Sequence, residues 1–320
     1  MNSEENYIET QPHRFFFKGK GSAYFSIVFV NFLLTIVTLG LYYPWAKCSK
    51  LKYLYENTEF ADSPFAFLGN GKELFKGFIK LLVAAIVFFG IYASLAYNQQ
   101  LVLAVIFLYS GLFLLVPIAL HGSYRYRLSR TTWRNIHFGY RGQITELFSE
   151  WIIGSILSIL TIGIYSPWFT TRIRKYMISN IRFGDVKFDY EGEGSELFVI
   201  HLKGIFLSLI TFGIYSFWYT KDLYNYYINN ITIEQNDYLH RVESKMTGGD
   251  FFELFIVNYI LLVFTLGLAF PFVQVRTFKY LAEKLLVEGT FNPDAIVQTE
   301  EDYKDATGED LASWLDIDLI

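Results

Sequence analysis

The sequence has little of what soluble or secreted proteins usually contain. Its 320 residues include a single cysteine, Cys48, so no disulfide can form within the chain and a disulfide-stabilised scaffold is excluded. Only 18% of the residues are charged, compared with about 25% in average soluble proteins. The segment from Met1 to Arg14 is polar and acidic and does not read as a signal peptide. We therefore expect the first apolar segment to act as the targeting signal.

The sequence also lacks the patterns that carry catalysis. No phosphate-binding loop, nucleophile elbow or carboxylate pair lies within an apolar run. A recurring Gly-x-Gly has neither the third glycine nor the βαβ context of a dinucleotide site. Five histidines are scattered without zinc-ligand spacing: His13, His121, His137, His201 and His240. We predict a protein that is not an enzyme and that holds no cofactor or metal.

The chain is instead rich in long apolar runs. Hydrophobic residues make up 52% of the sequence, and the mean hydropathy is +0.28. A helix that crosses a bilayer needs about 20 mostly apolar residues. Six runs reach or approach this length: 24–45, 81–97, 101–120, 151–169, 204–219 and 254–273. A buried core helix would explain any single run, but six runs predict membrane insertion.

Four of these runs end in a phrase that the chain repeats. It reads Thr-x-Gly followed by five residues of which at least two are aromatic, and it begins at Thr38, Thr161, Thr211 and Thr265. The glycine suits a helix end with positive φ, so we predict that the apolar helix stops there. A single helix kinked at proline is the alternative. A second phrase, Phe-x-Phe and then Gly-x-Gly, predicts a short strand and a turn before the next helix.

The repeats predict a predominantly α membrane protein built from similar units. In each unit, a Gly-rich turn leads into an apolar membrane helix, an interfacial amphipathic helix follows, and a short β-hairpin closes the unit. We expect about six apolar membrane helices in all. The membrane domain covers 13–287, after a polar N-terminal tail at 1–12. Its units lie near 13–63, 64–134, 135–186, 187–243 and 244–287.

The C-terminal segment 288–320 has a different composition. It contains ten acidic residues and one basic residue, which predicts a solvated, disordered tail. A short amphipathic turn at Leu311, Trp314 and Leu315 that binds a partner is the alternative. The rest of the chain is basic, which suits contact with anionic lipid headgroups.

Charge predicts the sidedness of one pair of runs. Two runs flank Asn98-Gln99-Gln100, and Lys or Arg residues stand at both outer ends. The positive-inside rule then places this connection in the periplasm and both outer ends in the cytoplasm. Elsewhere every connection carries Lys or Arg, which conflicts with simple alternation across the membrane. Either some units dip in and return to the same side, or the rule fails for one connection.

Polar side chains within the apolar runs are the candidate site, because they are costly in a membrane. Asn31 and Asn258 each lie seven residues, about two helical turns, before a motif threonine and so share its face. Interhelical packing is favoured over a polar pathway. The candidate polar positions are Asn31, Asn258, Thr38, Thr161, Thr211 and Thr265. The candidate headgroup contacts are Lys47, Lys50, Lys52, Arg172, Arg174 and Lys175.

Three phrases together resemble the YjgN family of bacterial inner-membrane proteins, a domain of unknown function. They are Thr-Leu-Gly-x-Tyr-x-Pro-Trp, the stretch Ser-Arg-Thr-Thr-Trp-Arg-Asn-Ile-His-Phe at 129–138, and Phe-x-Phe-x-Gly-x-Gly-x-Glu-Leu-Phe. The resemblance covers 13–290 and implies a multi-pass protein of the bacterial inner membrane. It brings no catalytic residues. Phe217 replaces the proline in one copy, and Ala269-Phe270 replaces the tyrosine pair in another.

Two functions remain open from the sequence, with an integral-membrane enzyme as a third and weaker one. The first is a non-catalytic membrane scaffold or lipid-interacting protein, whose partners are membrane lipids with anionic headgroups. The second is a transporter or channel-like protein for a small polar solute. We favour the first because basic residues recur in every unit, whereas Asn occurs in two. We expect no nucleic acid among its partners, and a homo-oligomer or a protein partner stays open.

Overall fold

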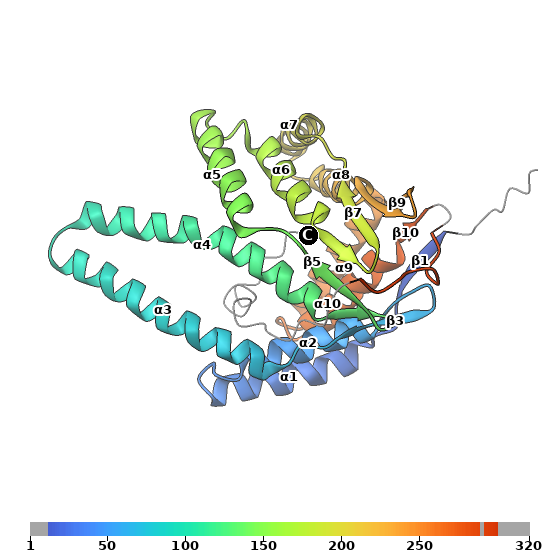
Figure 1. The fold of residues 1–320 in the computed structure, drawn as a ribbon, viewed down its shortest axis with the longest axis horizontal. Coiled ribbons are helices and arrows are strands. Elements are labelled where there is room, and N and C mark those ends of the chain that lie inside the picture. Colours follow the sequence, from blue (N-terminus) through green and yellow to red (C-terminus); the bar gives the residue numbers. More distant parts are fainter. Residues whose placement is uncertain (1–11, 289–290, 300–320) are drawn as a thin grey trace, which may run out of the picture.

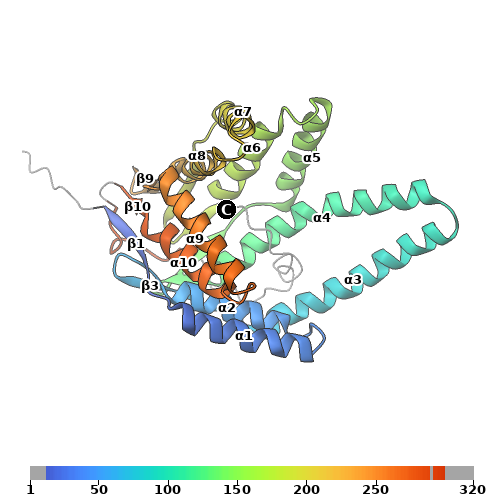
Figure 2. The ribbon, with the colours of Figure 1, turned by 180° about the vertical axis from the view of Figure 1, so that it is seen from behind.

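The structure is a computed structural model that describes residues 12–288 and 291–299. Within them, the order strand, helix, helix, strand occurs five times in succession (Figure 1). The strands gather on one side of the molecule, and the helical pairs spread away from them (Figures 1 and 2).

The strands form one closed antiparallel barrel, in which each strand pairs with its neighbours in sequence. His13 on the first strand pairs with Val287 on the last, which closes the barrel and leaves no free edge. The strands are β1 (His13–Phe17), β2 (Thr58–Phe60), β3 (Ser63–Phe67), β4 (Thr131–Trp133), β5 (Ile136–Tyr140), β6 (Ile181–Phe183), β7 (Val186–Tyr190), β8 (Ile231–Gln235), β9 (Tyr238–Ser244) and β10 (Leu285–Val287).

Tight turns connect each helix–helix unit to the next at one end of the barrel. The turn pairs 61–62, 134–135 and 236–237 have positive φ at both central residues, which is the type I′ geometry that matches the twist of paired strands. The turn between β6 and β7 has Gly184 at φ 57°. The pairing of Phe183 with Val186 makes β6 and β7 a hairpin, as the sequence predicts for the end of a unit.

The main hydrophobic core lies inside the barrel and is rich in aromatic rings. Trp133, Phe60 and Phe183 are buried there, and the ring of Phe138 stacks on that of Phe183 with centroids 4.2 Å apart. The three buried rings end the short strands β2, β4 and β6, and the first aromatic residues of the Phe-x-Phe phrases pack against them: Phe15, Phe65, Phe138 and Phe188. The barrel is therefore filled with side chains.

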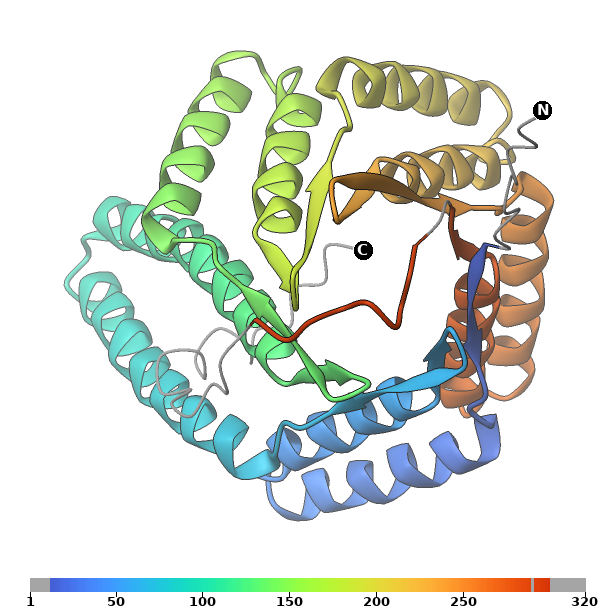
Figure 3. The same cartoon turned by 45° about the vertical axis from the view of Figure 1, so that its right-hand side comes forward.

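The helices surround this barrel in two layers (Figure 3). Even-numbered helices are the inner layer, and each packs on the odd-numbered strand of the next unit, as α2 does on β3 and α10 on β1. Odd-numbered helices form the outer layer. The helices are α1 (Gly21–Val37), α2 (Tyr43–Glu56), α3 (Gly71–Tyr97), α4 (Leu101–Ser129), α5 (Ile144–Leu160), α6 (Ser166–Ser179), α7 (Gly194–Ile210), α8 (Ser216–Asn229), α9 (Gly248–Phe264) and α10 (Phe270–Glu283).

The predicted set of about six membrane helices, each with a separate β-hairpin, is wrong. Among the helices that the structure describes, only α3 and α4, with 27 and 29 residues, are long and apolar enough to cross a membrane. The other four runs each extend across a Thr-x-Gly break. Their outer helices α1, α5, α7 and α9 have 17 residues each, or about 25 Å at 1.5 Å per residue. The short strands join into one barrel, since each hairpin strand also pairs with the strand at the other end of its helical pair, and β1 pairs with β10.

The barrel also shows how the five helical pairs are oriented relative to one another. The first and last strand of every helix–helix unit belong to the same barrel. All five helical pairs therefore leave one end of the barrel and return to that end. Copies of the Phe-x-Phe phrase lie together rather than on opposite faces.

Candidate functional site

Four exposed tips join the outer helix to the inner helix in the units other than α3–α4. At each tip the helix ends in a Schellman arrangement: the N–H of Gly163, for example, donates to the carbonyl of Ser158 at 2.7 Å. Gly163 and Gly213 have φ of 86° and 90°, so the predicted helix break is confirmed and a continuous kinked helix is excluded. The residue before each glycine also has positive φ, between 50° and 51°, and is 93–98% exposed: Leu39, Ile162, Phe212 and Leu266.

Large apolar residues with positive φ are uncommon because the left-handed conformation crowds the Cβ atom. A residue keeps such a strained conformation only where the surrounding structure holds its backbone in place. Strained residues are common at functional sites, so these four positions are candidates for a function. Here it presents a bulky apolar side chain to the exterior at four equivalent places.

The motif threonines hold these breaks. Thr38 Oγ1 donates to the carbonyl of Leu34 at 2.7 Å and accepts the N–H of Tyr42 at 3.0 Å. The same two bonds are made by Thr161, Thr211 and Thr265. The hydroxyls thus bridge the end of one helix and the start of the next, within their own tip.

The outer faces of the odd-numbered helices continue the apolar surface of the tips. We call this surface, together with the four tips, the apolar ring. Many large apolar side chains exposed on the same helices indicate contact with lipid or a partner. Its exposed members include Phe32, Val37, Val83, Ile86, Ile156, Ile159, Leu202, Leu209, Ile260 and Phe264.

The two predicted asparagines lie in different surroundings. Asn31 on α1 is 6% exposed, and its Nδ2 has no hydrogen-bond partner among the described residues. Asn258 on α9 donates from Nδ2 to Thr277 Oγ1 at 2.9 Å and accepts from Arg276 Nη1 at 3.0 Å. Asn258 therefore links α9 to α10 by hydrogen bonds.

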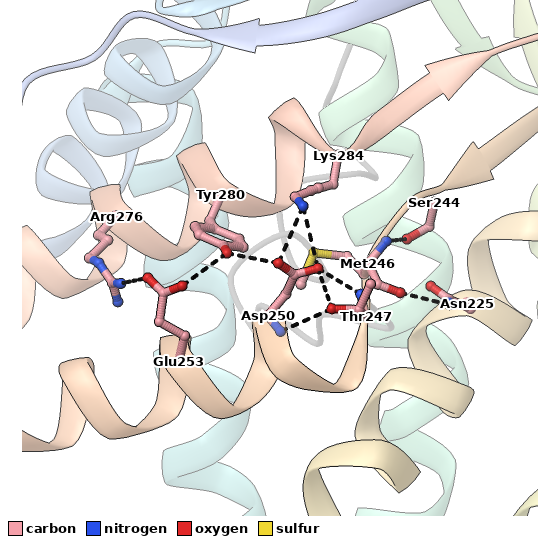
Figure 4. Close-up of polar contacts among 9 residues, drawn as sticks. All are labelled: Asn225, Ser244, Met246, Thr247, Asp250, Glu253, Arg276, Tyr280 and Lys284. Atoms are coloured by element: carbon pink, nitrogen blue, oxygen red, sulfur yellow. Dashed lines mark hydrogen bonds and ion pairs between the residues drawn. The ribbon is translucent and has the colours of Figure 1, made fainter.

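Through Arg276, Asn258 joins a polar network that follows the α9–α10 pair. Figure 4 shows the part of this network that runs from Arg276 to Lys284. Arg276 pairs with Glu253 at 3.0 Å, and Lys284 pairs with Asp250 at 3.2 Å. Between them, the hydroxyl of Tyr280 donates to Asp250 Oδ1 at 2.9 Å. The sequence interpretation missed this network. The sequence does contain a pattern that could have indicated it. Two acidic residues lie three positions apart on α9, and Arg, Tyr and Lys follow at intervals of four residues along α10 and its end.

Asp250 also forms a capping box at the start of α9. Its Oδ2 accepts the N–H of Thr247 at 2.7 Å, and its own N–H donates to Thr247 Oγ1 at 3.2 Å. Burial raises the pKa of the Asp250 carboxyl, but the bonds from Thr247, Tyr280 and Lys284 outweigh it and lower the pKa from 3.8 to about 2. Burial and the Asp250 charge raise the pKa of Tyr280 to about 12.

We expect Asp250→Asn to lower the thermal midpoint of the detergent-solubilised protein at pH 7. Because the folded-state pKa of Asp250 is depressed, its stabilisation is present above about pH 4 and is lost as the pH falls through about 2. The difference in midpoint between the two proteins should therefore shrink from pH 4 downward. The matched control is Asp237→Asn in the exposed β8–β9 turn. A difference that is constant from pH 7 to pH 2.5 would show that the charge of Asp250 has no part in the effect.

The predicted headgroup cations do not share one environment. Lys47 is buried, and Lys50 and Lys52 are half-buried. Arg174 lies over the Tyr227 ring, with its guanidinium carbon 4.5 Å from the centroid. Arg172 is exposed and pairs with Glu150 at 2.7 Å, and Lys175 is exposed.

The sequence interpretation also missed a set of equivalent tyrosines on the inner helices. Tyr53 accepts the N–H of Lys20 at 2.6 Å and donates to its carbonyl at 2.8 Å, at the loop that starts α1. Tyr176 contacts Gln143 in the same way, and Tyr226 donates to the Glu193 carbonyl. Each hydroxyl fixes the start of an outer helix to the inner helix of its unit. The signal was a Tyr eight residues after the motif Trp in each of these three copies.

These features define a class of protein: a barrel filled with aromatic side chains, surrounded by helical pairs with an apolar outer surface. The family described as a bacterial protein of unknown function (DUF898) matches residues 12–191, 185–238 and 219–314. The chain belongs to this family, and the resemblance to YjgN proteins is confirmed.

Two relatives show the extent of the similarity. The inner membrane protein YjgN of Salmonella typhimurium strain LT2 is 30% identical over 166 residues, which are 52% of this chain and 40% of that protein. The inner membrane protein YjgN of Escherichia coli O157:H7 is 31% identical over 164 residues, or 51% of this chain and 39% of that protein. The matched region thus spans less than half the length of these relatives. No solved structure matches the chain.

Proposed function

We propose that the protein is embedded in the bacterial inner membrane through the apolar ring and acts there as a non-catalytic scaffold or lipid-interacting protein. The observation that carries the proposal is the exposure of large apolar side chains on every outer helix and at all four tips. The names of the curated relatives, inner membrane proteins, support the location.

The lengths of the helices support two modes of insertion. α3 and α4 have 27 and 29 residues, about 40 Å at 1.5 Å per residue, which exceeds a hydrocarbon core of about 30 Å. This pair crosses the bilayer. The four shorter pairs enter the bilayer at their tips and turn back to the side of the barrel.

Charge supports the sidedness of this arrangement. Lys72, Lys76 and Lys80 lie at the start of α3, and Arg125, Arg127 and Arg130 lie at the end of α4 or just beyond it. These cations flank the barrel end of the pair, whereas its far end is the uncharged connection 98–100. By the positive-inside rule the barrel is cytoplasmic and the connection is periplasmic.

In this proposal, cations of the inner helices that reach the surface contact anionic headgroups. Arg172 and Lys175 are exposed and Lys52 is half-buried, so these three reach the surface. The alternative is a transporter for a small polar solute. Its supporting observation is the buried amide nitrogen of Asn31, which finds no partner among the described residues. The aromatic filling of the barrel argues against a route through the barrel itself.

The test compares lipid retention in three forms of the purified protein by native mass spectrometry. Changing Lys52, Arg172 and Lys175 to Gln should weaken retention of phosphatidylglycerol by about 1 kcal/mol for each cation replaced, roughly fivefold each. The control changes three barrel cations, Lys18, Lys187 and Arg241, to Gln. The third form carries Asn31→Ala and Asn258→Ala. Lipid retention that is equal in all forms, with solute uptake abolished only in the asparagine variant, would favour the transporter.

A further inference from the structure

The turn end of the barrel is covered by a segment that is not a strand. Residues 291–299, which we call the strap, run across the opening enclosed by the strands (Figure 3). The strap has no regular secondary structure. It is nonetheless held at several points on different strands and turns.

Two apolar side chains anchor the strap in the barrel core. Phe291 and Ile296 are buried among the core residues, which include Trp133 and Phe183. The carbonyl oxygen of Phe291 lies 3.0 Å from His13 Nε2. Five strap residues other than the anchors are exposed: Asn292, Asp294, Val297, Gln298 and Thr299. Much of the strap thus lies on the surface, tied down by the two buried anchors.

The barrel binds the strap mainly through backbone atoms of the strap. The side-chain amide of Gln235 donates to the carbonyl of Asn292 at 2.8 Å and accepts its N–H at 2.9 Å. Asp185 makes the matching pair with Val297: its N–H donates to the carbonyl at 3.0 Å, and its Oδ1 accepts the N–H at 2.9 Å. These two reciprocal pairs hold the strap backbone on either side of a turn at 293–294, in which the N–H of Ala295 donates to the carbonyl of Asn292 at 3.3 Å. Neither pair uses the side chain at 292 or 297.

Side-chain contacts add selectivity around these pairs. Arg134 pairs with Asp294, and the N–H of His137 donates to Gln298 Oε1 at 2.9 Å. Gly184 is required here for a second reason besides its positive φ, since a Cβ atom at this position would overlap the carbonyl oxygen of Val297. The β6–β7 turn is therefore shaped for a peptide chain that passes directly over it.

We propose that the turn end of the barrel is a peptide-acceptor site and that residues 291–299 are its intramolecular occupant. The partner that fits is a segment that makes a turn between an aromatic residue and an aliphatic residue five positions later, with an acidic residue two positions before the aliphatic one. Such a segment binds when the strap leaves. This proposal is independent of how the helices meet the membrane.

The first test uses the full chain and a fluorescent synthetic peptide of residues 291–299. Full-length protein with Phe291→Ala and Ile296→Ala should bind this peptide saturably, at least tenfold more tightly than the unchanged chain, whose site is occupied. A peptide carrying the same two substitutions should not bind, and adding Gln235→Leu to the protein should weaken binding. A folded double variant that fails to bind the peptide, or that binds both peptides equally, would overturn the proposal.

A second measurement on the unchanged chain does not depend on the folding of any variant. In hydrogen exchange, the amides of Asn292, Val297 and Asp185 should exchange together, at least tenfold faster than ladder amides of β8 and β9. That result means that the strap detaches while the barrel stays closed. If these three amides exchange only at the rate of the barrel strands, the strap is a fixed part of the barrel and the proposal is wrong.

Discussion

Replacement of Trp133 by alanine is expected to lower the free energy of unfolding by about 3–5 kcal/mol, as for other fully buried aromatic residues. Trp133 on β4 is 1% exposed. Its ring lies edge-to-face against Phe183 with centroids 5.9 Å apart, and it also contacts the ring of Phe60. Its Nε1 donates to the carbonyl of Ser63 at 2.9 Å, and the substitution removes this donor.

The measurement is chemical unfolding of the detergent-solubilised protein, followed by circular dichroism. The control is Tyr238→Ala on β9, where the ring is exposed, and a change within about 0.5 kcal/mol is expected there. Suppose that the free energy of unfolding of the Trp133 variant falls by less than about 1 kcal/mol. Then either the barrel interior repacks to fill the space of the missing ring, or packing inside the barrel contributes little to the stability of the fold.

Lysine at both Val83 and Ile86 is expected to prevent insertion of the α3–α4 pair. Both side chains are exposed and lie one turn apart near the middle of α3. A lysine at the centre of a membrane helix costs about 2.5–3.5 kcal/mol, so the pair costs roughly 5–7 kcal/mol. The fraction of protein that resists alkaline extraction from inner membranes should fall sharply.

The matched control places lysine at Tyr238 and Leu239, which are about as exposed but lie on the barrel. That variant should stay in the membrane fraction. If the α3 variant also stays, the exposed face of α3 is not in contact with lipid. If both variants leave the membrane, the substitutions act on folding rather than on insertion.

Local features of the fold could be predicted because their causes are local. The glycine of each Thr-x-Gly phrase has the positive φ expected from the sequence, and the Phe-x-Phe phrases at Phe65 and Phe188 are strands. Closure of the barrel could not be predicted in this way, because β1 pairs with β10 from the other end of the described chain. The tip between two helices of a pair is itself apolar, as at the exposed Ile162. A hydropathy pattern therefore does not separate the two helices and predicts one long apolar run.

The hydrogen-bond partners of the candidate polar residues could not be predicted from the sequence. The threonines were assigned to a shared polar face, whereas the structure uses the hydroxyl of Thr38 to bridge two backbones within its own tip. Asn258 does hydrogen-bond between helices, but through Arg276 and Thr277 of the same unit. Such partners depend on the rotation of each helix, which periodicity does not fix.

The strap shows a different limit of sequence reasoning. Its composition belongs to an acidic tail, and only Phe291 and Ile296 supply anchors in the barrel core. Two apolar residues are too few to stand out in a polar segment. The amphipathic turn considered at 311–315 lies outside the described residues, as does most of the predicted disordered tail.

Cysteine labelling tests the central claim, that the barrel lies on one side of the membrane and the far end of α3–α4 on the other. Single cysteines replace Gln99 in the connection and Asp62 or Asn236 in two barrel turns, in a Cys48→Ala background. An impermeant maleimide on intact cells should label Gln99→Cys and should reach the turn positions only after permeabilisation. Labelling of Gln99→Cys and Asp62→Cys from the same side, or of the two turns from opposite sides, would contradict the account.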